Sequence, residues 1–149
     1  NGEEVSWDVE KEWVVKEPRD QVVGFGTKVL QGSVNTNKGP RQYWRKITAY
    51  ATSYKPGDPG VGNITASGTR LKKGVVAVKV SWFSYMRGLE VYIPGYGLAR
   101  IEDTGGGIPG KTWIDLGYEK DNYVPWSQNV TVYFLYPVPP ADSIMWVLD

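Results

Sequence analysis

Glycine and proline interrupt this chain of 149 residues at short intervals, which limits it to short elements of secondary structure. The 18 Gly and 10 Pro separate segments that are rich in β-branched and aromatic residues, the types that favour strands. Several such segments at roughly 8–12-residue spacing are typical of a closed barrel or a sandwich. The sequence therefore predicts an all-β fold, with helix limited to a turn or two around residues 118–126.

Six segments carry the strand pattern in the larger part of the chain. The clearest is the alternation of Ile47, Ala49 and Ala51 with polar or aromatic neighbours. It ends at residues 55–60, where Pro and Gly forbid continuation of the strand. Residues 81–87 are expected to form a loop. The predicted strands cover residues 45–53, 75–78, 89–93, 98–103, 112–116 and 130–138.

The composition of the chain changes near residue 30. Residues 1–28 contain seven acidic and four basic side chains, whereas residues 29–149 contain nine acidic and thirteen basic side chains. Residues 31–40 are mostly small and polar, as in a linker that cannot bury enough surface to pack. We therefore expect a short N-terminal β extension at residues 1–28, a linker at 29–42, a barrel at 43–138 and a tail at 139–149.

The absence of Cys and His excludes several kinds of catalytic site. A Ser-His-Asp triad, a thiolate nucleophile and the usual zinc sites all need one of these residue types. Catalysis would have to come from carboxylates, Lys, Tyr, Ser or Thr, or from a metal held by oxygen ligands. We expect neither a metal nor a cofactor in this protein.

The overall charge bears on the class of partner. The net charge is +1, and no basic run is present, which argues against a nucleic-acid partner and fits a carbohydrate or peptide better. No window approaches the ~18 to 20 apolar residues of a membrane span. The chain is expected to be a monomer with no membrane span, and its lack of Cys fits either a cytosolic or a secreted bacterial protein.

Two aspartates are the strongest candidates for acid–base chemistry. Asp103 comes directly before a turn with three successive glycines, where backbone N–H groups are unshielded. Asp115 lies within an apolar strand, where desolvation would raise its pKa and keep it protonated, as a general acid requires. The alternative is that Asp103 caps the turn and Asp115 makes a buried hydrogen bond.

Seven motifs follow one another between residues 45 and 136. They are Thr48-Ala49-Tyr50, Thr65-Ala66-Ser67-Gly68, Val76-Ala77-Val78-Lys79, Gly88, Tyr92-Ile93-Pro94-Gly95-Tyr96-Gly97, Asp103-Thr104-Gly105-Gly106 and Ile114-Asp115. In this pattern the chain resembles the three-aspartate domain family of bacterial cell-wall proteins, whose fold is a six-stranded double-psi β-barrel related to the barrel of the membrane-bound lytic transglycosylase A. The resemblance implies that same fold here.

Three further segments precede these motifs: Asn1-Gly2-Glu3, Glu17-Pro18 and residues 22–28. In these segments residues 1–28 resemble the closing part of a five-glycine domain, an all-β module of wall-associated proteins. Together the two resemblances imply a bacterial protein that is extracellular or associated with the cell wall. They also imply that the chain is part of a longer secreted precursor.

The activity that the resemblance implies is that of a peptidoglycan lytic transglycosylase. Such an enzyme cleaves the β-1,4 bond between N-acetylmuramic acid and N-acetylglucosamine and leaves a 1,6-anhydro product. Asp115 matches the general acid/base of the family. Asp103 matches a second aspartate, which is expected to orient the substrate and stabilise charge on the sugar ring.

Further residues of the motifs are expected to bind the glycan strand. Thr65 and Ser67 match a loop that faces the groove, and the ring of Tyr96 is expected to stack on a sugar. Lys111 is placed to reach a lactyl or peptide-stem carboxylate. Other substrate-binding residues expected at the groove are Tyr50, Lys79, Gly105 and Gly106.

Lys79 stands where the family has its first aspartate, and this leaves two possibilities open. A cation in the groove would lower the pKa of nearby carboxyl groups and make Asp115 a poorer proton donor. Alternatively, Lys79 forms an ion pair with Asp103 and leaves Asp115 unaffected. The alternative to an enzyme is therefore a non-catalytic module that binds peptidoglycan or another glycan of the cell wall.

Overall fold

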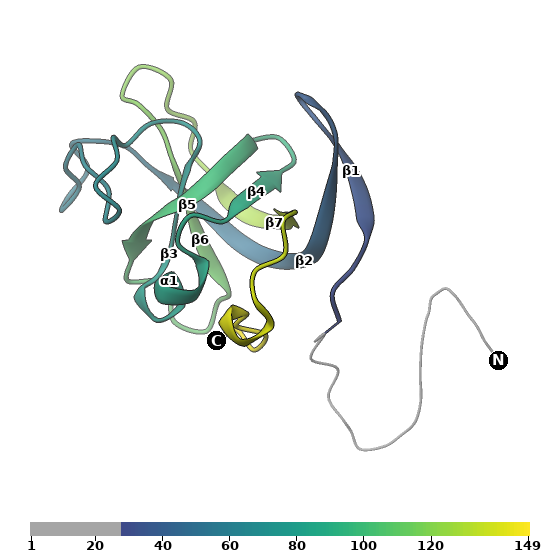
Figure 1. Ribbon diagram of the computed structural model, residues 1–149. Coiled ribbons are helices and arrows are strands. Elements are labelled where there is room, and N and C mark those ends of the chain that lie inside the picture. Colours follow the sequence, from purple (N-terminus) through teal and green to yellow (C-terminus); the bar gives the residue numbers. More distant parts are fainter. Residues whose placement is uncertain (1–27) are drawn as a thin grey trace.

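Strand β2 (Gly39–Tyr54) is the longest element and contacts three other strands. The computed structural model describes residues 28–149, so the β module expected at residues 1–28 lies outside the described residues. The other strands are β1 (Gly32–Thr36), β3 (Val75–Lys79), β4 (Glu90–Ile93), β5 (Gly97–Gly105), β6 (Trp113–Gly117) and β7 (Ser127–Leu135). The helical elements are α1 (Val80–Met86) and the 3-10 turn η1 (Ala141–Ser143). The predicted all-β class is confirmed (Figure 1).

The seven strands form one mixed sheet in the order β1-β2-β6-β3-β5-β4-β7. Strand β7 also pairs with β2, so the six strands from β2 to β7 form a closed ring. The β2–β6 and β3–β5 pairs are parallel, and the other pairs are antiparallel. Each strand of this ring therefore has a partner on both sides, and β1 extends the sheet beyond it.

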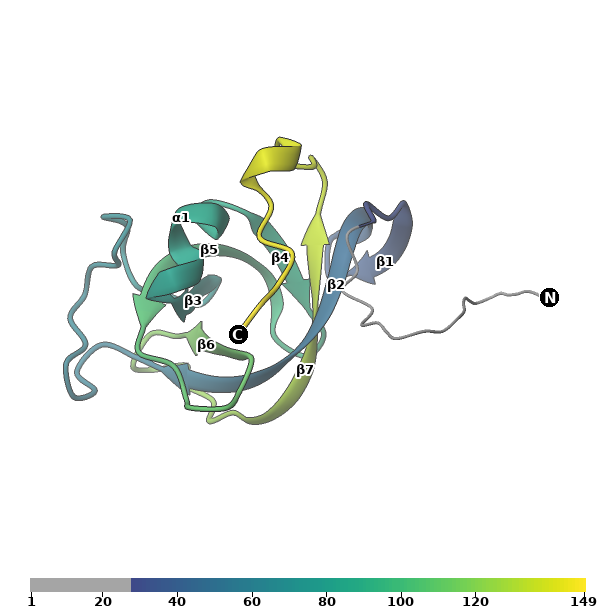
Figure 2. The same ribbon diagram turned by 90° about the horizontal axis from the view of Figure 1, so that it is seen from below.

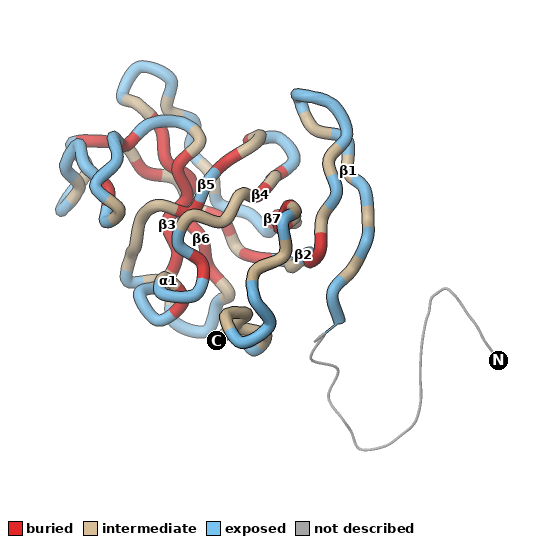
Figure 3. Tube along the Cα trace, viewed as in Figure 1, coloured by how far each residue is buried: buried red, intermediate tan, exposed pale blue. Residues whose placement is uncertain are grey.

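The core is formed by side chains of the ring strands and of α1. Figure 3 shows buried stretches of the chain, in red, where β3 and β6 lie. The largest fully buried side chains of the core include Trp44 on β2 and Trp82 on α1. Alternation along β2 sends Ala49 and Ala51 inward, as the sequence pattern predicted. A second, smaller cluster lies outside this core and consists of Tyr54, Leu71, Val75 and Ala77.

Two secondary-structure predictions were wrong. Residues 80–86 form helix α1 instead of a loop, and residues 118–126 contain no helix. Trp82 and Met86, one helical turn apart, are 0% and 3% exposed, so burial of this pair stabilises the short helix. Within the described residues, no helix is long and apolar enough to cross a lipid bilayer.

The stretch expected to be an unpacked linker contains strand β1 and the start of β2. The five residues of β1 pair antiparallel with residues 39–43 of β2. The Thr36 hydroxyl donates to the Gly39 carbonyl oxygen at 2.6 Å and accepts from the Lys38 N–H at 3.0 Å, which closes the turn. Gly39 has a φ of 93°, which L residues rarely adopt. A hairpin held by backbone pairing needs little buried apolar surface. The small polar residues of this stretch therefore suggested a linker although the stretch is part of the sheet.

The last residues of the chain pass from β2 toward α1 across one end of the ring (Figure 2). Arg45 donates hydrogen bonds to the carbonyl oxygens of Met145 and Trp146 at 2.7 and 2.8 Å. The Trp146 ring packs edge-on against Trp44, with 6.2 Å between ring centroids. The tail thereby covers the buried tryptophan of β2.

Candidate functional site

The strand register brings the two candidate aspartates to the same row of the sheet. Across the pairs β5–β3 and β3–β6, Asp103 and Asp115 each lie opposite Ala77. Asp115 in turn lies opposite Thr52 on β2. Neighbouring strands are about 4.8 Å apart, so the Cα atoms of the two aspartates are about 10 Å apart. The small side chain of Ala77 stands between the two carboxyl groups.

An irregularity in β5 turns Asp103 toward this row. Val76 pairs with Ile101, but the next residue, Ala77, pairs with Asp103, so Glu102 is an extra residue in β5. A bulge of this kind shifts the following side chains to the other face of the strand. In a regular ladder, Glu102 would face Ala77 and Asp103 would point away from Asp115.

The Asp103 carboxylate accepts three hydrogen bonds. Its Oδ1 accepts from the backbone N–H groups of Ala66 and Thr104, both at 2.9 Å. Its Oδ2 accepts from the Tyr54 hydroxyl at 2.7 Å. Burial and the contact with Asp103 raise the pKa of Tyr54, so its hydroxyl stays protonated and remains a donor. Asp103 therefore joins β5 to β2 and to the loop at residues 65–69.

Asp115 has a sparser set of partners. Its Oδ1 accepts from the Thr52 hydroxyl at 2.9 Å, and the Thr52 oxygen accepts from Trp113 Nε1–H at 2.9 Å. The indole donor thus fixes which way the Thr52 hydroxyl points. Within residues 28–149, Thr52 is the one side-chain donor to the Asp115 carboxyl group.

Burial raises the pKa of Asp115 to about 6. The hydrogen bond from Thr52 acts in the opposite direction, and the negative charges of Asp58 and Asp103 add to the increase. Asp58 is held ionised by Lys55, whose hydrogen bond lowers the pKa of Asp58. The direction predicted from the apolar neighbours of Asp115 is confirmed, and a group with this pKa can exist in both protonation states near neutral pH.

Thr65 and Ser67 lie in the loop that is docked on β5, but neither side chain faces open solvent. Thr65 is 6% exposed, and its hydroxyl lies 2.7 Å from that of Thr69 within the same turn. The N–H of Ser67 donates to the Glu102 carbonyl oxygen at 3.0 Å, and its hydroxyl is buried. In this geometry both residues shape the loop that supports Asp103, in contrast to the predicted contact with substrate.

The two glycines expected at the groove differ in their surroundings. A Cβ atom on Gly105 would lie 2.5 Å from the Trp113 ring, so this glycine leaves room for the indole that orients Thr52. A Cβ atom on Gly106 would meet nothing within 4 Å, and this residue is exposed. Gly105 is therefore a packing residue, whereas Gly106 lies at an open surface.

Tyr96 does not stand at a binding surface, so the prediction that it stacks on a sugar was wrong. Its side chain is 4% exposed and packs edge-on against Tyr118. Its hydroxyl accepts from the Gly74 N–H at 2.7 Å and lies 2.6 Å from the Gly117 carbonyl oxygen. Burial raises the pKa of Tyr96, which keeps this hydroxyl protonated. The tyrosine ties the start of β3 to the end of β6.

Lys79 does not pair with Asp103. Its Nζ donates to the backbone oxygen of Asp149 at 2.7 Å and lies 3.7 Å from the Asp149 carboxylate. Trp82 Nε1–H holds the same carboxylate at 2.7 Å. The ion pair with Asp103, one of the two alternatives, is therefore not formed, and Lys79 is not among the groups that shift the pKa of Asp115. Lys79 lines a cavity of about 350 Å³ together with Gly105, Gly106 and Asp149.

Tyr50 and Lys111 meet beside the β2 end of the row, where Tyr50 lies two residues before Thr52 on the same face of the strand. The Lys111 Nζ lies 4.6 Å from the centre of the Tyr50 ring, within the range of a cation–π interaction. The Tyr50 hydroxyl is hydrogen-bonded to the Ser127 hydroxyl. Tyr50 is partly exposed and Lys111 is exposed, so both predicted residues are accessible.

Sequence reasoning missed three residues that hold the site. Thr52 and Tyr54 follow Tyr50 at every second position of β2, so the three share one face of the strand. Thr52 contacts Asp115, and Tyr54 contacts Asp103. The alternation of residues along this strand was visible in the sequence, so Thr52 and Tyr54 could have been predicted as site residues. The third, Trp113, depends on the packing between β6 and Gly105, which only the fold reveals.

The row offers two carboxylates as possible metal ligands. Among the described residues, no three His, Cys, Asp or Glu side chains form a group that could hold a metal ion. Asp103 is already engaged by three hydrogen-bond donors. Two carboxyl groups in this setting are suited to proton transfer and to hydrogen bonding with hydroxyl groups.

Comparison with known proteins links part of the chain to a cell-wall protein. No protein-family model matches the sequence. Over 82 residues the chain is 35% identical to the cell wall-binding protein YocH of Bacillus subtilis (strain 168). This match covers 52% of the chain and 28% of YocH, so the chain spans less than a third of that relative's length. Among solved structures it is similar to the Streptomyces papain inhibitor, with 19% sequence identity, a TM-score of 0.46, and coverage of 63% of this chain and 97% of the inhibitor.

Proposed function

We propose that this chain is a cell-wall module that binds peptidoglycan glycan strands along the row of aspartates and the adjoining Tyr50. The observation that carries the proposal is the register that sets Asp103, Asp115 and Thr52 side by side on one face. The partial similarity to a cell wall-binding protein supports it. The bacterial cell wall is the proposed location.

The chemistry of the row suits a glycan. Carboxylate and hydroxyl oxygens accept hydrogen bonds from sugar hydroxyls, and the partly exposed Tyr50 ring offers an apolar face. Lys111 stands beside that ring, where it can pair with a carboxylate of the lactyl group or the peptide stem. A neutral sugar backbone with occasional carboxylates therefore fits both the polar row and the cation at its end.

The fold assignment is part of this proposal. The ring of six strands with two parallel pairs supports a double-psi barrel of the three-aspartate family. The order of the sequence motifs supports it as well. The loop that donates to Asp103 and the strand that carries Asp115 both belong to these motifs.

Sedimentation with purified sacculi tests the binding proposal. The double variant Tyr50→Ala/Lys111→Ala should lower the bound fraction about tenfold, because it removes the ring and the cation at the end of the row. The matched control is Tyr85→Ala/Lys46→Ala, which removes an exposed tyrosine and an exposed lysine elsewhere. Equal binding by the two double variants would refute this location of the glycan site.

The pKa of Asp115 favours lytic cleavage as a second candidate function. With a pKa of about 6, Asp115 can protonate the glycosidic oxygen while the bond from that oxygen to C1 of the muramoyl residue breaks. The resulting carboxylate then takes the proton of the muramoyl 6-hydroxyl as that oxygen bonds to C1. One carboxyl group serves both steps, and no water is consumed.

Product analysis decides between binding and cleavage. Sacculi incubated with the protein are examined by mass spectrometry for 1,6-anhydro muropeptides, with Asp115→Asn as the comparison. Anhydro products that disappear in this variant would establish the lytic reaction. Binding to sacculi without anhydro products at pH 5 to 7 would leave the non-catalytic module as the function.

A further inference from the structure

A basic cleft is lined by neither of the two aspartates of the row. It has a volume of about 500 Å³ and is formed by the β1–β2 hairpin, the loop at residues 69–74 and strands β4 and β5. Glu102, the extra residue of the β5 bulge, lines this cleft, whereas its neighbour Asp103 faces the row. The basic side chains in the lining are Lys38, Arg41, Arg70, Lys72, Lys73 and Arg100.

The cleft concentrates the positive charge of the described chain. It holds six of the fourteen basic side chains in residues 28–149 but two of the nine acidic ones. These cations come from three segments of the sequence, at residues 38–41, 70–73 and 100, and folding brings the three segments together. Outside the cleft, basic and acidic side chains are nearly equal in number, which makes the cleft the main basic feature of this part of the chain.

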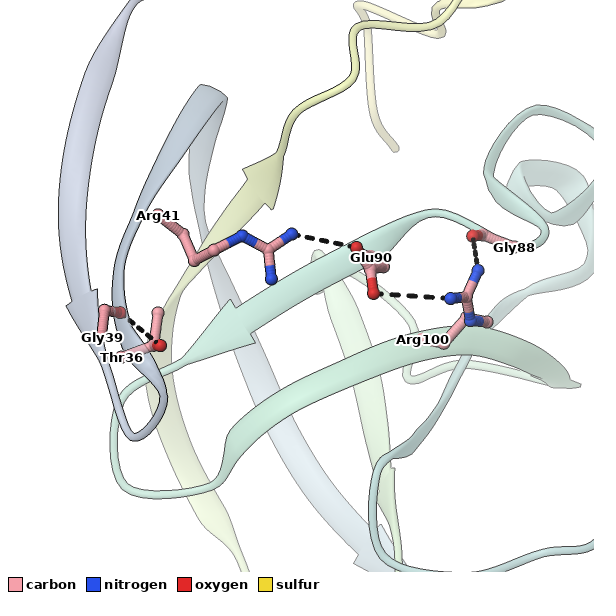
Figure 4. A network of polar contacts seen from close by, with 6 residues as sticks. All are labelled: Thr36, Gly39, Arg41, Gly88, Glu90 and Arg100. Atoms are coloured by element: carbon pink, nitrogen blue, oxygen red, sulfur yellow. Dashed lines mark hydrogen bonds and ion pairs between the residues drawn. The ribbon is translucent and has the colours of Figure 1, made fainter.

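Glu90 fixes two of the arginines at the rim, as Figure 4 shows. Its Oε1 accepts from Arg41 at 3.0 Å, and its Oε2 accepts from Arg100 at 3.4 Å. Arg100 also donates to the Gly88 carbonyl oxygen at 2.9 Å. A guanidinium has five N–H donors, so both arginines keep donors for a ligand while their positions are set in advance.

The composition of the cleft distinguishes among polyanions. None of its lining residues is aromatic, whereas single-stranded nucleic acids are bound by stacking bases on aromatic rings. The cations are spread over three separate elements, so a single small anion would reach one or two of them. A flexible chain with a negative charge at every repeat would contact several at once.

We propose that this basic cleft binds an anionic polymer of the cell wall whose repeats are joined by phosphodiester groups. The proposal rests on the wall association proposed above, but it does not depend on the glycan site. Simultaneous contacts to a wall polymer and to a glycan strand would hold the protein to the wall by two weak interactions, each raising the effective concentration of the other.

Titration with poly(glycerol phosphate) at several salt concentrations tests the proposal. Binding of the wild-type protein should release the small counterions that surround the polymer. Because this release is less favourable at high salt, the affinity should fall steeply as salt rises. The variant Arg70→Gln/Lys72→Gln/Lys73→Gln should bind about 100-fold more weakly at low salt. A second variant on a different element, Lys38→Gln, should lose about fivefold.

The matched control is Lys28→Gln/Lys46→Gln/Arg87→Gln, which removes three exposed charges outside the cleft and should change the affinity less than threefold. Equal losses in both triple variants, or no binding by the wild-type protein, would overturn the proposal. Tighter binding of single-stranded DNA with the same number of charges would also overturn it in favour of a nucleic acid.

Acid-stripped sacculi separate this proposal from the glycan site, because acid removes phosphodiester-linked polymers and leaves the peptidoglycan. The triple variant of the cleft should bind stripped sacculi as well as the wild-type protein does. Loss of binding to stripped sacculi would overturn the separation of the two sites. Wild-type protein that binds the polymer but not stripped sacculi would refute the glycan site and support the cleft.

Discussion

Asp103 and Asp115 lie on either side of Ala77, but the protein surrounds them in opposite ways. Asp103 accepts hydrogen bonds from two backbone N–H groups and the Tyr54 hydroxyl. Asp115 accepts one from Thr52, and burial raises its pKa to about 6. A carboxylate with several donors stabilises its surroundings, whereas one that is buried with few donors changes its protonation state easily. The comparison predicts that Asp103 stabilises the fold, whereas Asp115 is the carboxyl group that can change its protonation state near neutral pH.

The largest expected effect is loss of stability on removing Asp103. The Asp103→Ala variant leaves two backbone N–H groups and the largely buried Tyr54 hydroxyl without an acceptor, so the free energy of unfolding should fall by about 3–5 kcal/mol. Urea denaturation measures this change. In Asp103→Asn the amide oxygen still accepts, so about half of the loss should be recovered. A change below about 1 kcal/mol for Asp103→Ala would contradict the structural role.

Replacing Asp115 should change the free energy of unfolding in a pH-dependent way. Near neutral pH, Asp115→Asn should stabilise the protein, whereas Asp103→Ala destabilises it. The folded pKa of Asp115, about 6, lies above the usual value of 3.8, so the folded state holds the proton more tightly than the unfolded state does. This contribution to stability is fully present below pH 3.8 and is lost as pH rises through about 6. Relative to Asp115→Asn, the wild-type protein should lose about 1–3 kcal/mol between pH 4 and pH 7. Parallel stability curves for the two proteins would contradict the raised pKa.

Removing the hydrogen bond from Thr52 should sharpen the difference between the two aspartates. This bond lowers the pKa of Asp115, so Thr52→Val should raise that pKa by about half a pH unit and cost about 1 kcal/mol through the unpaired Trp113 N–H. An NMR titration of the Asp115 carboxyl carbon follows the pKa. Thr48→Val, at an exposed position of the same strand, is the control. An unchanged midpoint would exclude Thr52 as the group that tunes Asp115.

The smallest effect is expected at Lys79. Its ion-pair partner Asp149 is 71% exposed, so Lys79→Ala should change the free energy of unfolding by less than about 0.5 kcal/mol. The midpoint of the Asp115 titration should stay where it is, because Lys79 does not contribute to the pKa of Asp115. A rise of that midpoint in the variant would restore the idea that a cation in the groove suppresses the acid.

The sequence was sufficient to predict the strands that carry the site. Alternation and Gly/Pro punctuation located β3, β4, β5 and β6 to within a few residues, because these signals are local. The apolar neighbours of Asp115 predicted the direction of its pKa for the same reason. Helix α1 was missed because burial of Trp82 and Met86 against distant strands stabilises it.

Features that depend on register and three-dimensional packing could not be predicted. The bulge at Glu102 turns Asp103 toward Asp115, and no composition or spacing rule marks it. The burial of Tyr96 depends on backbone groups of Gly74 and Gly117, which lie more than 20 residues away. The basic cleft joins side chains from three segments of the chain, so it exists only after folding.

The length of β2 has a consequence for the dynamics of the molecule. One end of this strand pairs with β1 next to the basic cleft, and the other end carries Thr52 and Tyr54 to the two aspartates. Residues 43–52 of β2 pair with β7, and the end that carries Thr52 and Tyr54 also pairs with β6. Opening either end would disturb a continuous ladder of backbone hydrogen bonds. The amide hydrogens at the centre of β2 should therefore exchange with deuterium only through global unfolding. The two surfaces would then share a single cooperative unit, and ligand binding at one should slow exchange at the other.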